Sequence, residues 1–225
     1  LRRDAQRLVN NDRNVFSALM LHHELADGMV TGVTRSYDIA LNDVQLVLNH
    51  VEHERTMGVS VVVNKNRTLF IADTNITELP EAEDLADIAE TTAHFARQFG
   101  FEPRVAFLSY STFGNPIGER MLKVRKAVEI LDGRDVDFEY EGDIAADVAL
   151  DPLHVLTYPF SRLTDAANVL VMPAIHSASI STKLLDALGS ATVLGPFLTG
   201  LEKPVQICSL GATASEIAQM ATLAT

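Results

Sequence analysis

Apolar residues along the chain follow two spacings. A recurrence every three or four residues, which is typical of helices with one buried face, predicts helices at 15–26, 37–51, 80–100, 118–133, 143–150, 179–189 and 213–224. Short runs rich in Val, Ile, Leu and Phe predict strands at 27–33, 59–74, 104–111, 136–142, 167–174, 191–197 and 204–209. The polar break at 64–67 divides the second of these runs into a hairpin.

The segment 80–100 carries the clearest helical pattern. Pro80 and several acidic residues precede its apolar face, and Gly100 follows it, as helix starts and ends require. Helices of this length alternate with strands over most of the chain. Such alternation predicts a largely parallel sheet with helices on both faces, that is, a three-layer α/β/α fold.

Small polar residues follow three of the predicted strands. Ser109, Ser111 and Thr112 follow the first, while His176 and Ser177 follow the second and Ser209 the third. Ligands of open α/β sheets bind beyond the carboxyl ends of the strands. The convergence of hydroxyl and imidazole groups therefore predicts a ligand site at that edge.

Composition narrows the class of protein. The 225 residues, 47% of them hydrophobic, suffice for one sizeable domain or two small lobes. A single cysteine, Cys208, excludes an internal disulfide and favours the cytoplasm, and no apolar run is long enough for a membrane helix. The net charge of −12 argues against nucleic acid as a partner, but allows a phosphorylated small ligand held by backbone amides and a few cations.

Six stretches, in this order, resemble the phosphate acetyl/butyryl-transferase family: ADGMVTGV, FGFEPRVAFLSYSTFGNP, KVRKAVEIL, EYEGDIAADVAL, ANVLVMPAI and LGPFLTGLEKPVQICSLGATASEI. The resemblance implies a fold of the phosphotransacetylase (isocitrate/isopropylmalate dehydrogenase-like) type over residues 1–225, as one domain that can form two lobes around a cleft. The family domain normally begins with further βα units that are absent here. FLSYSTFGNP and NVLVMP are closer to the branch found at the C-terminus of hybrid NADP-dependent malic enzymes.

The family's catalytic positions are only partly retained. Active transferases carry a Ser-Arg pair after the penultimate strand, where this chain has Ser209 and Leu210. The family aspartate that follows corresponds to Glu216, and a second arginine falls at or near Ala187. Acyl transfer to phosphate needs cations to hold the phosphoryl group, so the resemblance implies a pocket without its phosphate clamp.

The candidate residues also have structural interpretations. The loop of Ser109, Ser111, Thr112, Gly114 and Asn115 either contacts the thioester or pantetheine of acetyl-CoA or only caps the next helix. Thr213 and Glu216 have the spacing of a capping box, and Ser209 can equally be a helix-entry residue. Asp143 and Asp147 match an acidic pair of the family, or are helix-terminal and solvated charges. None of the seven histidines has the spacing of metal ligands, so no metal site is predicted.

The resulting hypothesis is a regulatory, catalytically inactive module that binds acetyl-CoA as an effector. Its ligand residues would be the loop above, together with Arg35, His176, Ser177 and Ser209. Its partners would be an acyl-CoA, the malic-enzyme part of the same full-length chain, where NADP and a divalent metal would bind, and further copies of itself, without nucleic acid or membrane. Two alternatives stay open: an active phosphate acetyltransferase, and a purely structural oligomerisation module.

Overall fold

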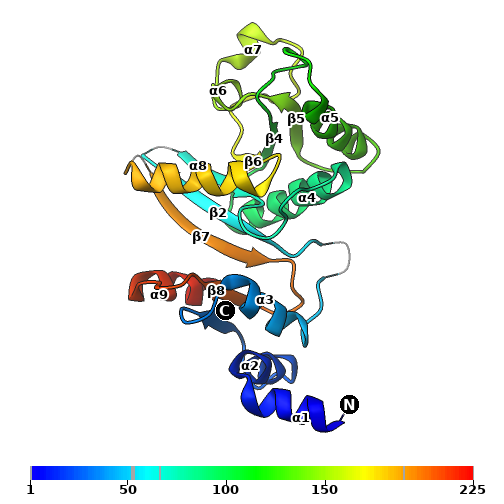
Figure 1. The fold of residues 1–225 in the computed structure, drawn as a ribbon. Helices are drawn as coiled ribbons and strands as arrows, with labels where there is room; N and C mark the ends of the chain where they lie inside the picture. The colour runs from blue at the N-terminus through cyan, green and yellow to red at the C-terminus, as the bar shows by residue number, and fades with distance from the viewer. Residues whose placement is uncertain (1, 52–53, 66, 190, 225) are drawn as a thin grey trace. The chain divides into compact units, whose positions relative to one another are not determined.

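The computed structural model describes residues 2–51, 54–65, 67–189 and 191–224 (Figure 1). The helices are α1 (Arg2–Asn11), α2 (Arg13–His22), α3 (Tyr37–Gln45), α4 (Ala82–Gln98), α5 (Glu119–Asp132), α6 (Ala146–Ala149), α7 (His154–Thr157), α8 (Ile175–Ala187) and α9 (Ala214–Leu223). The strands are β1 (Met29–Gly32), β2 (Met57–Asn64), β3 (Arg67–Ala72), β4 (Arg104–Leu108), β5 (Glu139–Ile144), β6 (Val169–Val171), β7 (Thr192–Thr199) and β8 (Val205–Cys208). They form two compact units, residues 1–56 with 197–225, and residues 57–196.

The larger unit, residues 57–196, contains a six-stranded sheet of order β5-β4-β6-β3-β2-β7, and the chain leaves this unit within β7. Strands β3, β6, β4 and β5 are parallel, which confirms the predicted α/β architecture. Strand β2 is antiparallel to β3, with Asn64 opposite Arg67, so the predicted hairpin is also confirmed. Its tight connection makes the antiparallel direction unavoidable, because parallel neighbours need a long crossover.

One face of this sheet packs on α4, which lies beside α5 (Figure 1). The ring of Phe70 lies 6.1 Å from that of Phe95 and 5.4 Å from that of Phe101. Helix α4 begins with a capping box between Glu81 and Asp84, and it ends just before Gly100, whose φ of +79° suits glycine. The predicted helix of 80–100 is therefore confirmed, with its ends two residues inside the expected limits.

The opposite face of the sheet carries a second, aliphatic core. Ile71, Leu108 and Leu170 are buried there, and side chains of the α6 and α8 regions pack against them. Because side chains alternate along a strand, neighbours such as Phe70 and Ile71 serve different cores. The short helix α7 was not predicted, since its four residues are too few to display a period.

The smaller unit is built around β1 and β8, which pair in parallel with Met29 opposite Val205 and Gly32 opposite Cys208. Helices α2, α3 and α9 pack against these strands. The prediction of a helix up to residue 51 is wrong at its end, because α3 stops at Gln45. A turn follows at residues 46–47, after which His50 bridges to Leu201 and the amide of Val51 donates to the carbonyl of Gly200.

No helix in the described part of the chain is long and apolar enough to cross a membrane.

Candidate functional site

The predicted site residues fall into both units. Seven of them belong to the larger unit, five in the β4–α5 loop and two at the start of α8, whereas Arg35 and Ser209 belong to the smaller unit. Each group has its own local geometry and is described separately.

The β4–α5 loop is organised around the carboxylate of Asp143, which is fully buried. The hydroxyl of Ser111 donates to Asp143 Oδ2, and the amide of Gly114 donates to the same oxygen at 3.2 Å. Arg125 Nε on α5 donates to Asp143 Oδ1 at 2.8 Å. Ser111 is itself buried, so its hydroxyl holds the loop in place.

Burial by itself disfavours the charged form of Asp143, but the hydrogen bonds outweigh it. The bonds from Arg125, Ser111 and Gly114 all stabilise the carboxylate and lower its pKa below the ordinary value. Asp143 is therefore an ionised structural group, whereas Asp147 is exposed on α6.

The other residues of the loop close on one another. Thr112 and Asn115 exchange backbone hydrogen bonds of 3.1 Å, and Thr112 Oγ1 accepts one from the amide of Ala145 at 3.1 Å. Ser109 Oγ accepts from the amide of Ser111 at 3.3 Å. Asn115 is exposed and Ser109 is half-buried. Of the five predicted residues, Asn115 keeps the side-chain surface that a ligand can reach most directly.

The two predicted residues of α8 differ in how accessible their side chains are to a ligand. Ser177 Oγ donates to the carbonyl of Ala174 at 2.8 Å within the first turn of the helix. His176 is exposed and contributes its imidazole to the surface at the carboxyl end of β6. A contact between His176 and a ligand stays a prediction.

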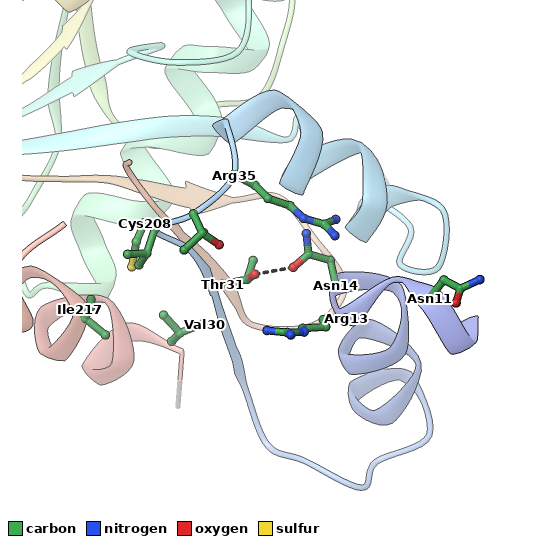
Figure 2. Close-up of a pocket in the computed structure, with 11 residues that line it drawn as sticks. Asn11, Arg13, Asn14, Val30, Thr31, Arg35, Cys208 and Ile217 are labelled. Carbon is green, nitrogen blue, oxygen red and sulfur yellow. Dashed lines mark hydrogen bonds between the residues drawn. The ribbon is translucent and has the colours of Figure 1, made fainter. Parts of the chain in front are cut away.

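In the smaller unit, a cavity of about 620 Å³ opens beside the carboxyl end of β1 (Figure 2). Its lining comes from the start of α2, from β1 and the turn after it, and from Cys208 and Ile217. The predicted Arg35 lies on its wall. Such a volume is in the range of small-molecule sites.

Arg35 is held between two carboxylates. Its Nη1 donates to Asp12 Oδ2 at 2.5 Å and to Asp43 Oδ2 at 2.9 Å. The other oxygen of Asp12 caps α2, where it accepts from the amide of Asn14 at 2.8 Å. Burial opposes the ionisation of Asp12, but the Arg35 hydrogen bond and the capping amides lower its pKa nonetheless. The guanidinium thus ties α2 to α3.

Asn14 links the hydrogen-bond network of Arg35 to strand β1. Its Nδ2 donates to Asp43 Oδ2 at 2.9 Å, and its Oδ1 accepts from Thr31 Oγ1 at 2.5 Å, the dashed bond in Figure 2. No sequence signal points to this role, because an asparagine in the first turn of a helix resembles an ordinary polar helix residue.

Arg13 is the available cation of this cavity, and it was missed by the sequence reasoning. Its side chain is exposed and extends over the cavity beside Thr31 and Val30 (Figure 2). No ion pair joins it to another described residue, unlike Arg35. Its position as the first residue of α2 was not recognisable, because the helix was predicted to begin at residue 15.

The residues after β8 have mixed roles. Cys208 is buried, and burial, followed by the charge of Glu216, raises the pKa of its thiol. Ser209 is exposed, and Leu210 exposes 64% of its surface. Thr213 and Glu216 form the expected capping box of α9: the amide of Thr213 donates to Glu216 Oε2 at 2.6 Å. This contact and the Thr213 hydroxyl lower the pKa of Glu216.

Within the described ranges, no group of three or more His, Cys, Asp and Glu side chains is arranged to hold a metal ion.

Comparison with known proteins matches residues 1–225 to the phosphate acetyl/butaryl transferase family. The chain is 54% identical to an NADP-dependent malic enzyme of Rhizobium meliloti, covering 99% of this chain and 29% of that protein. It is 32% identical to a phosphate acetyltransferase of Bacillus subtilis, covering 94% of this chain and 66% of that protein. A phosphotransacetylase structure from Streptococcus pyogenes superposes with a TM-score of 0.88 at 32% identity, over 94% of this chain and 65% of that one. The chain belongs to the phosphate acetyl/butaryl transferase family.

Proposed function

We propose that this chain is a regulatory, catalytically inactive module that binds acetyl-CoA and controls a cytoplasmic NADP-dependent malic enzyme of which it forms part. The similarity to the Rhizobium meliloti enzyme supports this reading, because it extends over almost the whole chain yet covers under a third of that protein. Malate, NADP and a divalent metal would bind in the remainder of such a full-length chain.

The observation that carries the proposal is which positively charged side chains are available to hold a phosphoryl group. Position 210, where the resemblance places an active-site arginine, is an exposed leucine. Arg35, which could have replaced it, is already shared by Asp12 and Asp43. A transferring phosphoryl group needs preorganised positive charge, and the loss of one such donor typically costs a hundred- to a thousand-fold in rate, about 3–4 kcal/mol.

Binding of acetyl-CoA requires fewer preorganised charges than transfer of its acetyl group to phosphate. Arg13 and the cavity of about 620 Å³ in the smaller unit suit a phosphate-bearing ligand, and Asn115 and His176 offer polar surface in the larger unit. Acetyl-CoA carries several phosphate oxygens, and a guanidinium such as that of Arg13 can bind them.

The mechanism that we propose is linkage. Acetyl-CoA would bind one quaternary or cleft-closure state more tightly and so shift the equilibrium toward it. The affinity of the malic-enzyme part for its substrate would change by the same coupling free energy, which for allosteric proteins is typically about 1–3 kcal/mol. Association with further copies of the chain belongs to this proposal, since coupled states in enzymes are commonly quaternary.

An active phosphate acetyltransferase is the second candidate function. It is favoured by the match to the Bacillus subtilis enzyme over two thirds of that protein, and by the exposed hydroxyl of Ser209 at a family position. In this case phosphate would have to be held by Arg13 in place of the missing arginine.

Calorimetric titration with acetyl-CoA, combined with an assay of acetyl phosphate formation on the same sample, tests the proposal. We expect saturable binding without turnover. Turnover would instead establish the transferase, and the absence of both signals from a folded, self-associating sample would leave the structural oligomerisation module.

A further inference from the structure

A second cavity, of about 510 Å³, lies on the aliphatic face of the six-stranded sheet in the larger unit. Its floor is formed by alternate residues of four neighbouring strands, and the following side chains reach it: Val62, Leu69, Ile71, Leu108, Leu170 and Met172. This is the face opposite Phe70 and its ring partners on α4. The floor is therefore a continuous hydrocarbon surface.

The roof of the cavity is mostly aliphatic, and it is incomplete. Leu185 and Ser181 of α8 line it on one side, and Ala146 and Leu150 of the α6 region line it on the other. Leu69, Leu150 and Leu185 are only half-buried, whereas Ile71 and Leu170 beneath them are buried. The two helical segments thus leave a gap over the sheet.

One end of the cavity is cationic. Lys65 and Arg67 of the β2–β3 hairpin line it there, and both are exposed. Arg67 Nη1 donates to the carbonyl of Leu150 at 2.6 Å, which fixes the guanidinium across the end of α6. Neither cation forms an ion pair with a described residue, although the chain carries a net charge of −12. This is a local concentration of uncompensated positive charge.

We propose that this cavity binds a free medium-chain aliphatic carboxylate. The hydrocarbon tail lies against the sheet between α8 and α6, and the carboxylate accepts hydrogen bonds from Arg67 and Lys65 at the hairpin. A mostly apolar pocket of about 300–1,000 Å³ with a few polar groups at one point is the usual form of a small-molecule site. None of the residues assigned above to acetyl-CoA lines this cavity, so the site is separate from the proposed effector site.

The probes are sodium hexanoate, octanoate and decanoate, titrated calorimetrically into the purified full-length protein. Each methylene that enters the cavity should tighten binding about four-fold, as the transfer of one CH₂ from water predicts. Decyltrimethylammonium, which has the same tail and the opposite charge, should not bind. Equal binding of the ammonium and the carboxylate would overturn the proposal, because the cavity would then be an apolar surface that does not recognise the carboxylate.

Three variants locate the site. Arg67→Gln and Lys65→Gln should each weaken decanoate binding about ten-fold, because a charge-assisted hydrogen bond is lost. Ser181→Leu, which places a good helix former in the roof, should abolish binding by filling the gap. The matched control is Lys126→Gln, an exposed lysine that pairs with Glu129 on α5 and should leave decanoate binding unchanged.

Unchanged decanoate affinity in both charge variants, which are exposed and need no repacking, would overturn the proposal even if Ser181→Leu failed to fold. So would decanoate binding confined to dissociated protein, since a second copy would then be the occupant of the cavity. Acetyl-CoA affinity, measured on the same variants, should not change, which keeps this test independent of the proposed effector function.

Discussion

At the residue scale, Asp143 shows how a polar loop can resemble a binding site and be held by internal bonds. Its carboxylate receives the hydroxyl of Ser111, the amide of Gly114 and Arg125 Nε. Asp143→Asn keeps the volume but leaves a guanidinium and a buried hydroxyl poorly paired. We expect the free energy of unfolding to fall by about 2 kcal/mol. The cost is limited because Arg125 is partly solvated.

The lowered pKa of Asp143 determines how this loss of stability depends on pH. The pKa of Asp143 is lowered in the folded protein from an ordinary value of 3.8, so its stabilisation is full above that value and is lost as the pH falls through the folded pKa. The difference between wild type and Asp143→Asn in urea unfolding should be constant from about pH 7 to 5 and shrink toward about pH 3. Asp147→Asn, exposed on α6, is the control and should change stability by under about 0.5 kcal/mol.

Arg13 and Arg35 offer a second contrast between a binding and a structural cation. Arg13→Gln should weaken acetyl-CoA about ten-fold with unchanged stability, because Arg13 is exposed at the cavity and forms no ion pair within the described residues. Arg35→Gln should lower the free energy of unfolding, since Asp12 and Asp43 then lose the guanidinium that they share. Calorimetry and urea unfolding separate the two effects. The opposite assignment, binding lost through Arg35 alone, would contradict the interpretation of the network.

At the element scale, α9 is a case where the sequence was sufficient. The spacing of Thr213 and Glu216 predicted a capping box, and both of its hydrogen bonds are present. Glu216→Ala should therefore lower stability by about 1 kcal/mol and leave acetyl-CoA affinity unchanged. Ser215→Ala, exposed in the same turn, is the control for thermal unfolding. A loss of affinity without loss of stability would instead place Glu216 in the ligand site.

The elements that sequence predicted least well depend on contacts distant in the chain. The apolar period of residues 37–51 is helical throughout, but pairing of His50 with Leu201 and of Val51 with Gly200 turns its end into extended chain. The hairpin and α4 were correct because their turns and caps are local. The site followed the same rule. The loop after β4 was predicted from its position, whereas the hydrogen bonds that Asp143 accepts from Ser111 and Arg125 were not, since they join residues from three separate segments.

At the scale of the whole molecule, we predict self-association from the distribution of exposed apolar side chains. Ile180, Leu184 and Leu188 repeat every four residues along the outer side of α8 and expose 57%, 54% and 76% of their surfaces. An unpartnered stripe of this kind is uncommon on a monomer, whereas scattered single leucines are ordinary. A helix stripe can be covered by the same stripe of a second copy, which makes an isologous contact.

Leu184→Lys should therefore shift the protein toward a smaller species without unfolding it, because the residue faces outward and lysine is a good helix former. Light scattering coupled to size-exclusion chromatography measures the mass, and circular dichroism verifies the fold. Leu153→Lys, on an exposed residue at the start of α7, is the matched control and should leave the mass unchanged. A wild-type mass equal to one chain would remove the quaternary route for the proposed regulation, and acetyl-CoA would then have to act within a single copy.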